Sequence, residues 1–203
     1  MFLLAAQPLL EDAFDSRWLV AARALVAGIV LAIFWRSYQE LFEAPRTSAR
    51  EWGLATCAGL AVAALWIALD SAWASSGAQA RPFMPLDAAG RLDPLLLAAR
   101  LVGFVVVVPV MEELFWRSFV MRWIQSRDFL ALDPRRTGTA AWVVSSALFA
   151  LEHHAWVAGL VAGLAYGRIY RRSGNLRACI ASHSISNAAL GGWILATHDW
   201  ALW

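Results

Sequence analysis

The chain is dominated by apolar stretches whose lengths are close to that of a membrane-spanning helix. A helix needs about 20 mainly apolar residues to cross a bilayer. In chain order, these stretches run over about 17–36, 52–74, 94–126, 139–153, 155–171 and 175–197. We therefore predict an all-α fold: a polytopic transmembrane helical bundle of about six spans.

Composition supports a membrane protein and excludes a nucleic-acid-binding one. Of the 203 residues, 60% are hydrophobic and only 16% are charged, whereas soluble domains are roughly half apolar and a quarter charged. The net charge is only +2 and all 17 basic residues are arginine, with no basic stripe for phosphates. The expected surroundings are membrane lipid.

The arginines predict an orientation. They gather in the loops after the first and third stretches and at the end of the fifth, and the alternate loops are poorer in them. Because cytoplasmic loops of membrane proteins are enriched in basic residues, we expect the three clusters in the cytoplasm and both termini outside. The clusters are Arg36, Arg46 and Arg50; Arg122, Arg127, Arg135 and Arg136; and Arg168, Arg171, Arg172 and Arg177.

The third apolar stretch marks the boundary between two parts of the chain. A helix over 94–126 is longer than one span, so it must tilt, break at Pro109 or project from the membrane. Residues 1–92 hold two predicted spans and a loop. Residues 93–203 hold the polar side chains that lie within spans, so we predict that this second part forms the functional core.

Polar side chains inside the spans gather in three places. The first is the segment "VVVVPVMEELFWRSF", which carries Glu112, Glu113 and Arg117. A charge at the bilayer centre costs about 3 kcal/mol or more, so such residues usually mark function. Glu113 and Arg117 are i,i+4 neighbours that can neutralise each other, and Glu112 is turned about 100° away. We predict a structural pair and one free carboxylate.

The other two places are "FALEHHAW" and "SHSISN". Phe149 with His153, and His183 with Asn187, again have i,i+4 spacing, so each pair shares a helix face. Counting helix rise, Glu112, His153 and His183 lie roughly 12 to 20 Å from the arginine-rich ends of their helices. We therefore predict one site that opens toward the cytoplasmic side.

These side chains suit hydrolysis by an activated water. A carboxylate removed from bulk water can act as a general base, and an adjacent imidazole can hold the water. A His–Asn pair can donate hydrogen bonds to a developing oxyanion. The spans contain no G-x-S-x-G nucleophile motif. The residues therefore favour water activation, with or without a metal.

At these residues the sequence resembles a known family. E-E-x-x-x-R (Glu112 to Arg117), F-x-x-x-H (Phe149, His153) and H-x-x-x-N (His183, Asn187) follow one another on successive hydrophobic helices, as in the type II CAAX prenyl endopeptidases, also called the CAAX protease and bacteriocin-processing family. The resemblance covers about 94–197. "VMEELFWRSFVMRW", "ALFALEHHAW" and "ILATHDWALW" further resemble a bacterial subgroup associated with exosortase and PEP-CTERM sorting systems.

The resemblance implies an intramembrane glutamate endopeptidase of the bacterial inner (plasma) membrane. It implies Glu112 as general base, His153 as the residue that binds and polarises the water, and His183 with Asn187 as the oxyanion hole. Its implied supporting residues are Glu113, Arg117, Phe149 and His154. Because His154 follows His153 directly, only the spacing from Phe149 favours His153 as the catalytic histidine.

The implied substrate is a peptide bond in a membrane-associated protein, either prenylated or carrying a sorted C-terminal tail. No cofactor is expected. Zinc remains an alternative because Glu and His can ligate it, but the spacing is not H-E-x-x-H.

Two other functions are compatible with the sequence. A non-catalytic membrane scaffold or chaperone of a sorting system would keep the polar cluster for stability. A proton-coupled carrier would use the Glu and His side chains as a relay. A relay needs no oxyanion donors, and the chain shows no internal repeat of the transporter kind, so the peptidase is favoured.

Overall fold

The computed structural model describes residues 16–43, 46–69, 75, 82–87 and 89–203. Within this part of the chain the secondary structure is helical, apart from one isolated bridge between Leu86 and Leu92. The prediction of an all-α fold is confirmed.

Each of the predicted apolar stretches contains a helix. The main helices are α3 (Ser16–Ile33), α4 (Glu40–Glu43), α5 (Ala49–Ala68), α6 (Pro94–Val102), α7 (Val108–Glu113), α8 (Arg122–Gln125), α9 (Thr139–Leu151), α10 (Trp156–Ser173) and α11 (Leu176–Thr197). Short 3-10 turns lie at Trp35–Ser37, Pro134–Arg136 and Trp200–Leu202. The predicted stretch 52–74 ends among residues 70–74, which lie outside the described residues.

Two helices among the described residues have the length and composition of a membrane crossing. They are α5 and the continuous helix Pro94–Gln125, which joins α6, α7 and α8. Their outer faces expose large apolar side chains, including Leu54, Leu60, Leu95, Val106 and Phe115. Apolar surface of this extent is typical of a membrane or protein interface.

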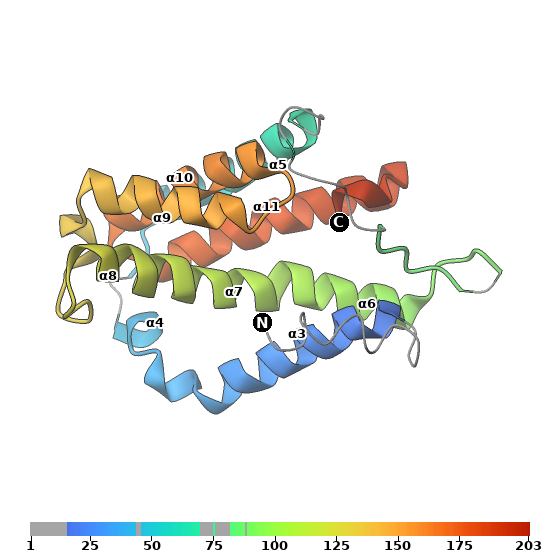
Figure 1. The fold of residues 1–203 in the computed structure, drawn as a ribbon, viewed down its shortest axis with the longest axis horizontal. Helices are drawn as coiled ribbons and strands as arrows, with labels where there is room; N and C mark the ends of the chain where they lie inside the picture. The colour runs from blue at the N-terminus through green and yellow to red at the C-terminus, as the bar shows by residue number, and fades with distance from the viewer. Residues whose placement is uncertain (1–15, 44–45, 70–74, 76–81, 88) are drawn as a thin grey trace.

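The long helix Pro94–Gln125 runs through Pro109 without a break (Figure 1, green). A proline has no N–H, and in an α-helix its ring clashes with the carbonyl four residues back. Here the preceding residues, Gly103–Val107, form a π-helical stretch, η3, in which the Val108 N–H donates to the Gly103 carbonyl five residues back. This wider turn accommodates the proline, so of the alternatives considered for this stretch a break at Pro109 does not occur.

Local signals in the sequence set the helix ends. Asp93 caps the long helix by accepting from the N–H groups of Leu95 and Leu96. Ser48 and Glu51 form a reciprocal capping box at the start of α5, which satisfies N–H groups that the first turn leaves free. Gly174, with φ of 64°, ends α10 in the left-handed conformation that glycine adopts without strain.

Small residues bring the helices of the bundle close together. α11 packs against α5, and α9 and α10 form an antiparallel pair beside it (Figure 1). A Cβ atom at Gly59 of α5 would lie 2.4 Å from the Ser182 carbonyl oxygen of α11, and one at Gly163 of α10 would lie 3.0 Å from Ser146 of α9. Such close backbone contact is a common way for membrane helices to pack.

The arginine-rich end of the bundle is closed by packed side chains. The carboxylate of Glu40 accepts hydrogen bonds from the hydroxyls of Tyr170 and Ser118 and lies 3.6 Å from Arg122. Next to it is a buried apolar cluster of Leu41, Met121, Tyr170, Leu176 and Cys179.

Candidate active site

A cavity of about 380 Å³ lies between the long helix, α11, α5 and the turn that joins α9 to α10. Its wall includes all four residues expected to be catalytic: Glu112, His153, His183 and Asn187. Phe149 and His154 also line it. Residues from three separate predicted helices therefore meet in one cavity.

Glu112 and Glu113 have different surroundings although they are adjacent. They end α7, just before a second π-helical stretch, η4 (Leu114–Met121). Glu112 lines the cavity, and its Oε2 has no hydrogen-bond partner among the described residues. Glu113 is 0% exposed and lies behind the cavity wall. The free carboxylate is thus the one that helical spacing predicted.

Glu113 holds two partners at once. Its Oε2 lies 3.1 Å from Arg117 Nε, which confirms the predicted pair. Its Oε1 lies 2.9 Å from Nδ1 of His183, a contact between different helices that the sequence did not predict. With Nδ1–H donating to the carboxylate, the free nitrogen of His183 is Nε2. Glu113 therefore orients a residue of the cavity.

Arg117 is as buried as its partner, with 1% exposure. Its guanidinium carbon lies 4.6 Å from the centre of the Phe149 ring, and its Nη2 lies 3.4 Å from the Gly163 carbonyl oxygen. Phe149 therefore contacts both the buried cation and His153, whose ring centre is 4.5 Å away. These contacts account for the expected supporting roles of Arg117 and Phe149 through packing.

Asn187 completes the backbone hydrogen bonding of the long helix. Its Nδ2 donates to the Phe104 carbonyl at 2.8 Å. In the register of η3 that carbonyl would accept from residue 109, but Pro109 has no N–H. An amide has two N–H donors, so one remains for a ligand in the cavity.

The structure distinguishes His153 from His154. Nδ1 of His153 lies 2.8 Å from the Phe149 carbonyl oxygen, which makes Nδ1–H the donor and leaves Nε2 as an acceptor. The ring packs edge-on against Trp66, with centres 5.5 Å apart. His154 lines the same cavity. The hydrogen bond to the Phe149 carbonyl is formed by His153.

Sequence reasoning missed several residues of the cavity wall. Tyr166 stacks on His183 at 4.8 Å with the rings 19° apart, and the lining residue Glu152 accepts a hydrogen bond at 3.1 Å from Trp116, which lies in the core behind the wall. Arg100, another charged side chain of the apolar stretch 94–126, also lines the cavity. The signal in the sequence that could have identified Arg100 was its charge within an apolar stretch. It was missed because Arg100 lies three turns from the glutamates and outside the three polar clusters.

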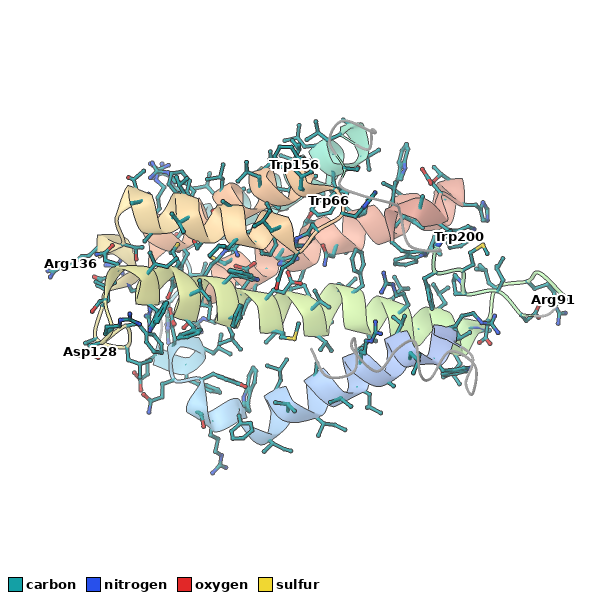
Figure 2. The ribbon with its side chains drawn as sticks, viewed as in Figure 1. Trp66, Arg91, Asp128, Arg136, Trp156 and Trp200 are labelled. Atoms are coloured by element: carbon teal, nitrogen blue, oxygen red, sulfur yellow. The ribbon has the colours of Figure 1, made fainter. Side chains whose placement is uncertain are left out.

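The cavity extends from Glu112 toward the end of the bundle where the long helix begins. Its wall extends to Phe83, Arg100 and Trp203. Figure 2 shows Arg136 and Asp128 at one end of the bundle and Arg91 and Trp200 at the other. The opening on the arginine-rich side stays a prediction, because helix rise gives a depth but does not show which end of a cavity is open.

A metal site would need several His, Cys, Asp or Glu side chains close together. Across the described ranges, no three His, Cys, Asp or Glu side chains are grouped closely enough to hold a metal ion. Glu112 and the two histidines share the cavity wall without forming such a group.

Fold and site together define an all-helical protein with apolar outer faces and an internal site of one free carboxylate, two imidazoles and an amide. Residues 94–189 match the family model of the Rce1-like type II CAAX prenyl endopeptidases. The family is a membrane-embedded protease family. The searches of curated proteins and of solved structures each found no match.

Proposed function

We propose that the protein is an intramembrane endopeptidase in which Glu112 activates a water molecule. The observation that carries this proposal is the unpaired Glu112 carboxylate in the same cavity as His153, His183 and Asn187. A buried carboxylate without a partner is costly, so its retention favours a chemical role over a structural one. The family assignment of residues 94–189 supports the same reaction class.

In the proposed reaction, water donates one hydrogen bond to Glu112 and the other to Nε2 of His153. Its lone pair then points at the scissile carbonyl carbon. Glu112 takes a proton as the C–O bond forms. The proton then passes to the departing amine as the C–N bond breaks, which leaves a carboxylic acid and an amine. General acid–base assistance of this kind contributes typically about 10²- to 10⁴-fold to rate.

The oxyanion that forms during attack requires donors. Asn187 offers its remaining Nδ2–H. His183, whose Nδ1 is held by Glu113, would serve as the second donor through Nε2–H in its imidazolium form. Glu113 acts here as a positioning residue, because it fixes the ring without lining the cavity.

The test compares Glu112→Gln with Glu113→Gln in the purified protein, using peptide cleavage and thermal unfolding. We expect Glu112→Gln to lose activity by about 10²-fold or more with unfolding unchanged, and Glu113→Gln to lower the melting temperature as well. Full peptidase activity in Glu112→Gln would refute the base assignment. Wild-type protein that cleaves no peptide in membranes would favour a scaffold.

A second comparison separates the two histidines. His153→Ala should remove the water acceptor and reduce kcat by roughly 10²-fold, whereas His154→Ala should keep kcat within a few fold. The reverse pattern would assign the catalytic role to His154.

We also propose that the chain crosses the membrane six times, through the six apolar stretches, in a bacterial inner membrane. The positive-inside rule then places the arginine clusters in the cytoplasm, and we propose that the cavity opens on the outer side, next to Arg100 and Trp203. A substrate would reach the cavity from that side. This favours an exported protein with a C-terminal sorting tail, as in exosortase-associated systems, over a protein prenylated in the cytoplasm.

We propose that hydrolysis requires no metal or other cofactor. Metal analysis of active protein and its activity in the presence of a chelator test this directly. Activity that follows zinc content would assign the Glu and His side chains to a metal instead.

A further inference from the structure

Arg100 lines the same cavity as the candidate catalytic residues, about three helical turns before Glu112 on the long helix. It is partly buried, and three aromatic rings surround its guanidinium. The guanidinium carbon lies 5.0 Å from the ring centre of Trp203, 5.3 Å from Phe83 and 5.4 Å from Phe104. Phe104 lies one helical turn from Arg100, whereas Trp203 comes from the far end of the chain and Phe83 from the loop before the long helix, so the tertiary fold helps to hold the cation in place.

The aromatic contacts leave the hydrogen-bonding capacity of Arg100 unused. Within the described residues, Arg91, Arg117 and Arg122 each form an ion pair with a carboxylate, and Arg100 forms none. Its Nε is buried without a hydrogen-bond partner. A guanidinium has five N–H donors in a fixed fork that matches a carboxylate. Cation–π contacts satisfy the charge in part but none of these donors.

The spacing between Arg100 and Glu112 sets the distance between a carboxylate bound at Arg100 and the scissile bond of a substrate. Both residues are on the continuous helix Pro94–Gln125, twelve positions apart, which corresponds to roughly 18 Å along the axis. An extended peptide advances about 3.3 Å per residue. A substrate that reaches from Glu112 to Arg100 therefore spans about five residues.

We propose that Arg100 and its three aromatic neighbours form a carboxylate-binding subsite, which anchors a substrate segment about five residues from the scissile bond. The carboxylate is either the free C-terminus of the segment or an acidic side chain near it. This inference rests on the proposed peptidase function and adds the substrate feature that the cavity recognises. The bidentate contact fixes the register of the segment relative to Glu112.

The test uses Glu112→Gln protein in detergent micelles, which should hold peptides without cleaving them. The probe is a library of N-acylated octapeptides, each made as a free acid and as a C-terminal amide, and mass spectrometry identifies the peptides retained. We expect retention of free acids, or of peptides with Asp or Glu near the end, to exceed that of their neutral counterparts by roughly 10-fold or more. Amidation and side-chain neutralisation distinguish the two sources of the carboxylate.

Variants assign the effect to the subsite. Adding Arg100→Gln should abolish the preference for a carboxylate, and Arg100→Lys should restore part of it by keeping the charge. Arg91→Gln is the matched control, since Arg91 is exposed near the same end of the molecule and pairs with Asp87. It should leave the preference unchanged.

Failure of the proposed subsite and failure of the proposed peptidase function give different results. Equal retention of acids and neutral peptides by Glu112→Gln protein would overturn the subsite, whatever the wild-type enzyme cleaves. A carboxylate preference that depends on Arg100, in a protein whose wild-type form cleaves no member of the library, would keep the subsite and count against the peptidase. With active wild-type enzyme, Arg100→Gln should raise KM far more than it lowers kcat.

Discussion

At the scale of single residues, the buried ion pair of Glu113 and Arg117 sets the geometry of the site. The two side chains are 0% and 1% exposed, and Glu113 also holds His183. Removing one partner of such a pair leaves an uncompensated charge in a low-dielectric environment, which typically costs about 3–5 kcal/mol. Removing both charges costs much less.

This predicts non-additive stabilities for the pair. Arg117→Met should destabilise the protein by about 3–5 kcal/mol, and Glu113→Gln with Arg117→Met should recover much of that loss. Thermal or denaturant unfolding in detergent measures the difference. Equal destabilisation by the single and double variants would show that the ion pair is not what stabilises this part of the long helix.

At the scale of helices, the contact between α5 and α11 depends on Gly59. A Cβ atom at this position would lie 2.4 Å from a backbone carbonyl oxygen of α11, whereas one at Gly53 of the same helix meets nothing within 4 Å. A backbone atom cannot move aside as the end of a side chain can. The two glycines of α5 therefore have different roles.

We predict that Gly59→Ala destabilises the protein by about 1–3 kcal/mol through overpacking. Gly53→Ala is the control, and its stability should be unchanged or raised by up to about 1 kcal/mol because alanine favours helix. The melting temperatures of both variants test this. A neutral Gly59→Ala would mean that the two helices can separate without cost.

The π-helical stretch before Pro109 links the shape of the long helix to the site. Asn187 donates to the carbonyl that Pro109 leaves without a helical partner. An alanine at position 109 would provide an N–H for the helix, so the hydrogen bond from Asn187 would contribute less to stability.

This predicts a positive coupling in a double-mutant cycle. Asn187→Leu should cost about 1–3 kcal/mol in the wild-type background, since it leaves a buried carbonyl unpaired, and less in the Pro109→Ala background. Denaturant unfolding of the four proteins gives the coupling energy. A coupling energy of zero would contradict this account of η3.

At the scale of the whole molecule, the cavity and the arginine clusters lie at opposite ends. We predict that a membrane-impermeant maleimide added to intact cells lacking the outer membrane labels Arg91→Cys but not Arg136→Cys. Both positions are exposed. The background for both is Cys57→Ser, because Cys57 is exposed whereas Cys179 is buried. Labelling of Arg136→Cys alone would reverse the proposed orientation and place the cavity mouth in the cytoplasm.

The sequence determined the features that depend on neighbours along the chain. The lengths of the apolar stretches predicted the helices, including the uninterrupted helix through residues 94–126 as one of three alternatives. The i,i+4 spacing predicted the contact of Glu113 with Arg117 and the separation of Glu112 from both. These predictions succeeded because helical period and apolar run length are local properties.

Only the tertiary structure decided which helix faces meet. The contact of Glu113 with His183 joins residues 70 apart in the chain, and that of Asn187 with Phe104 joins residues 83 apart. The aromatic surroundings of Arg100 and the open end of the cavity depend on the same long-range packing. Periodicity places a side chain on a face of its own helix, but the partner of that face is set by how all the helices fill space together.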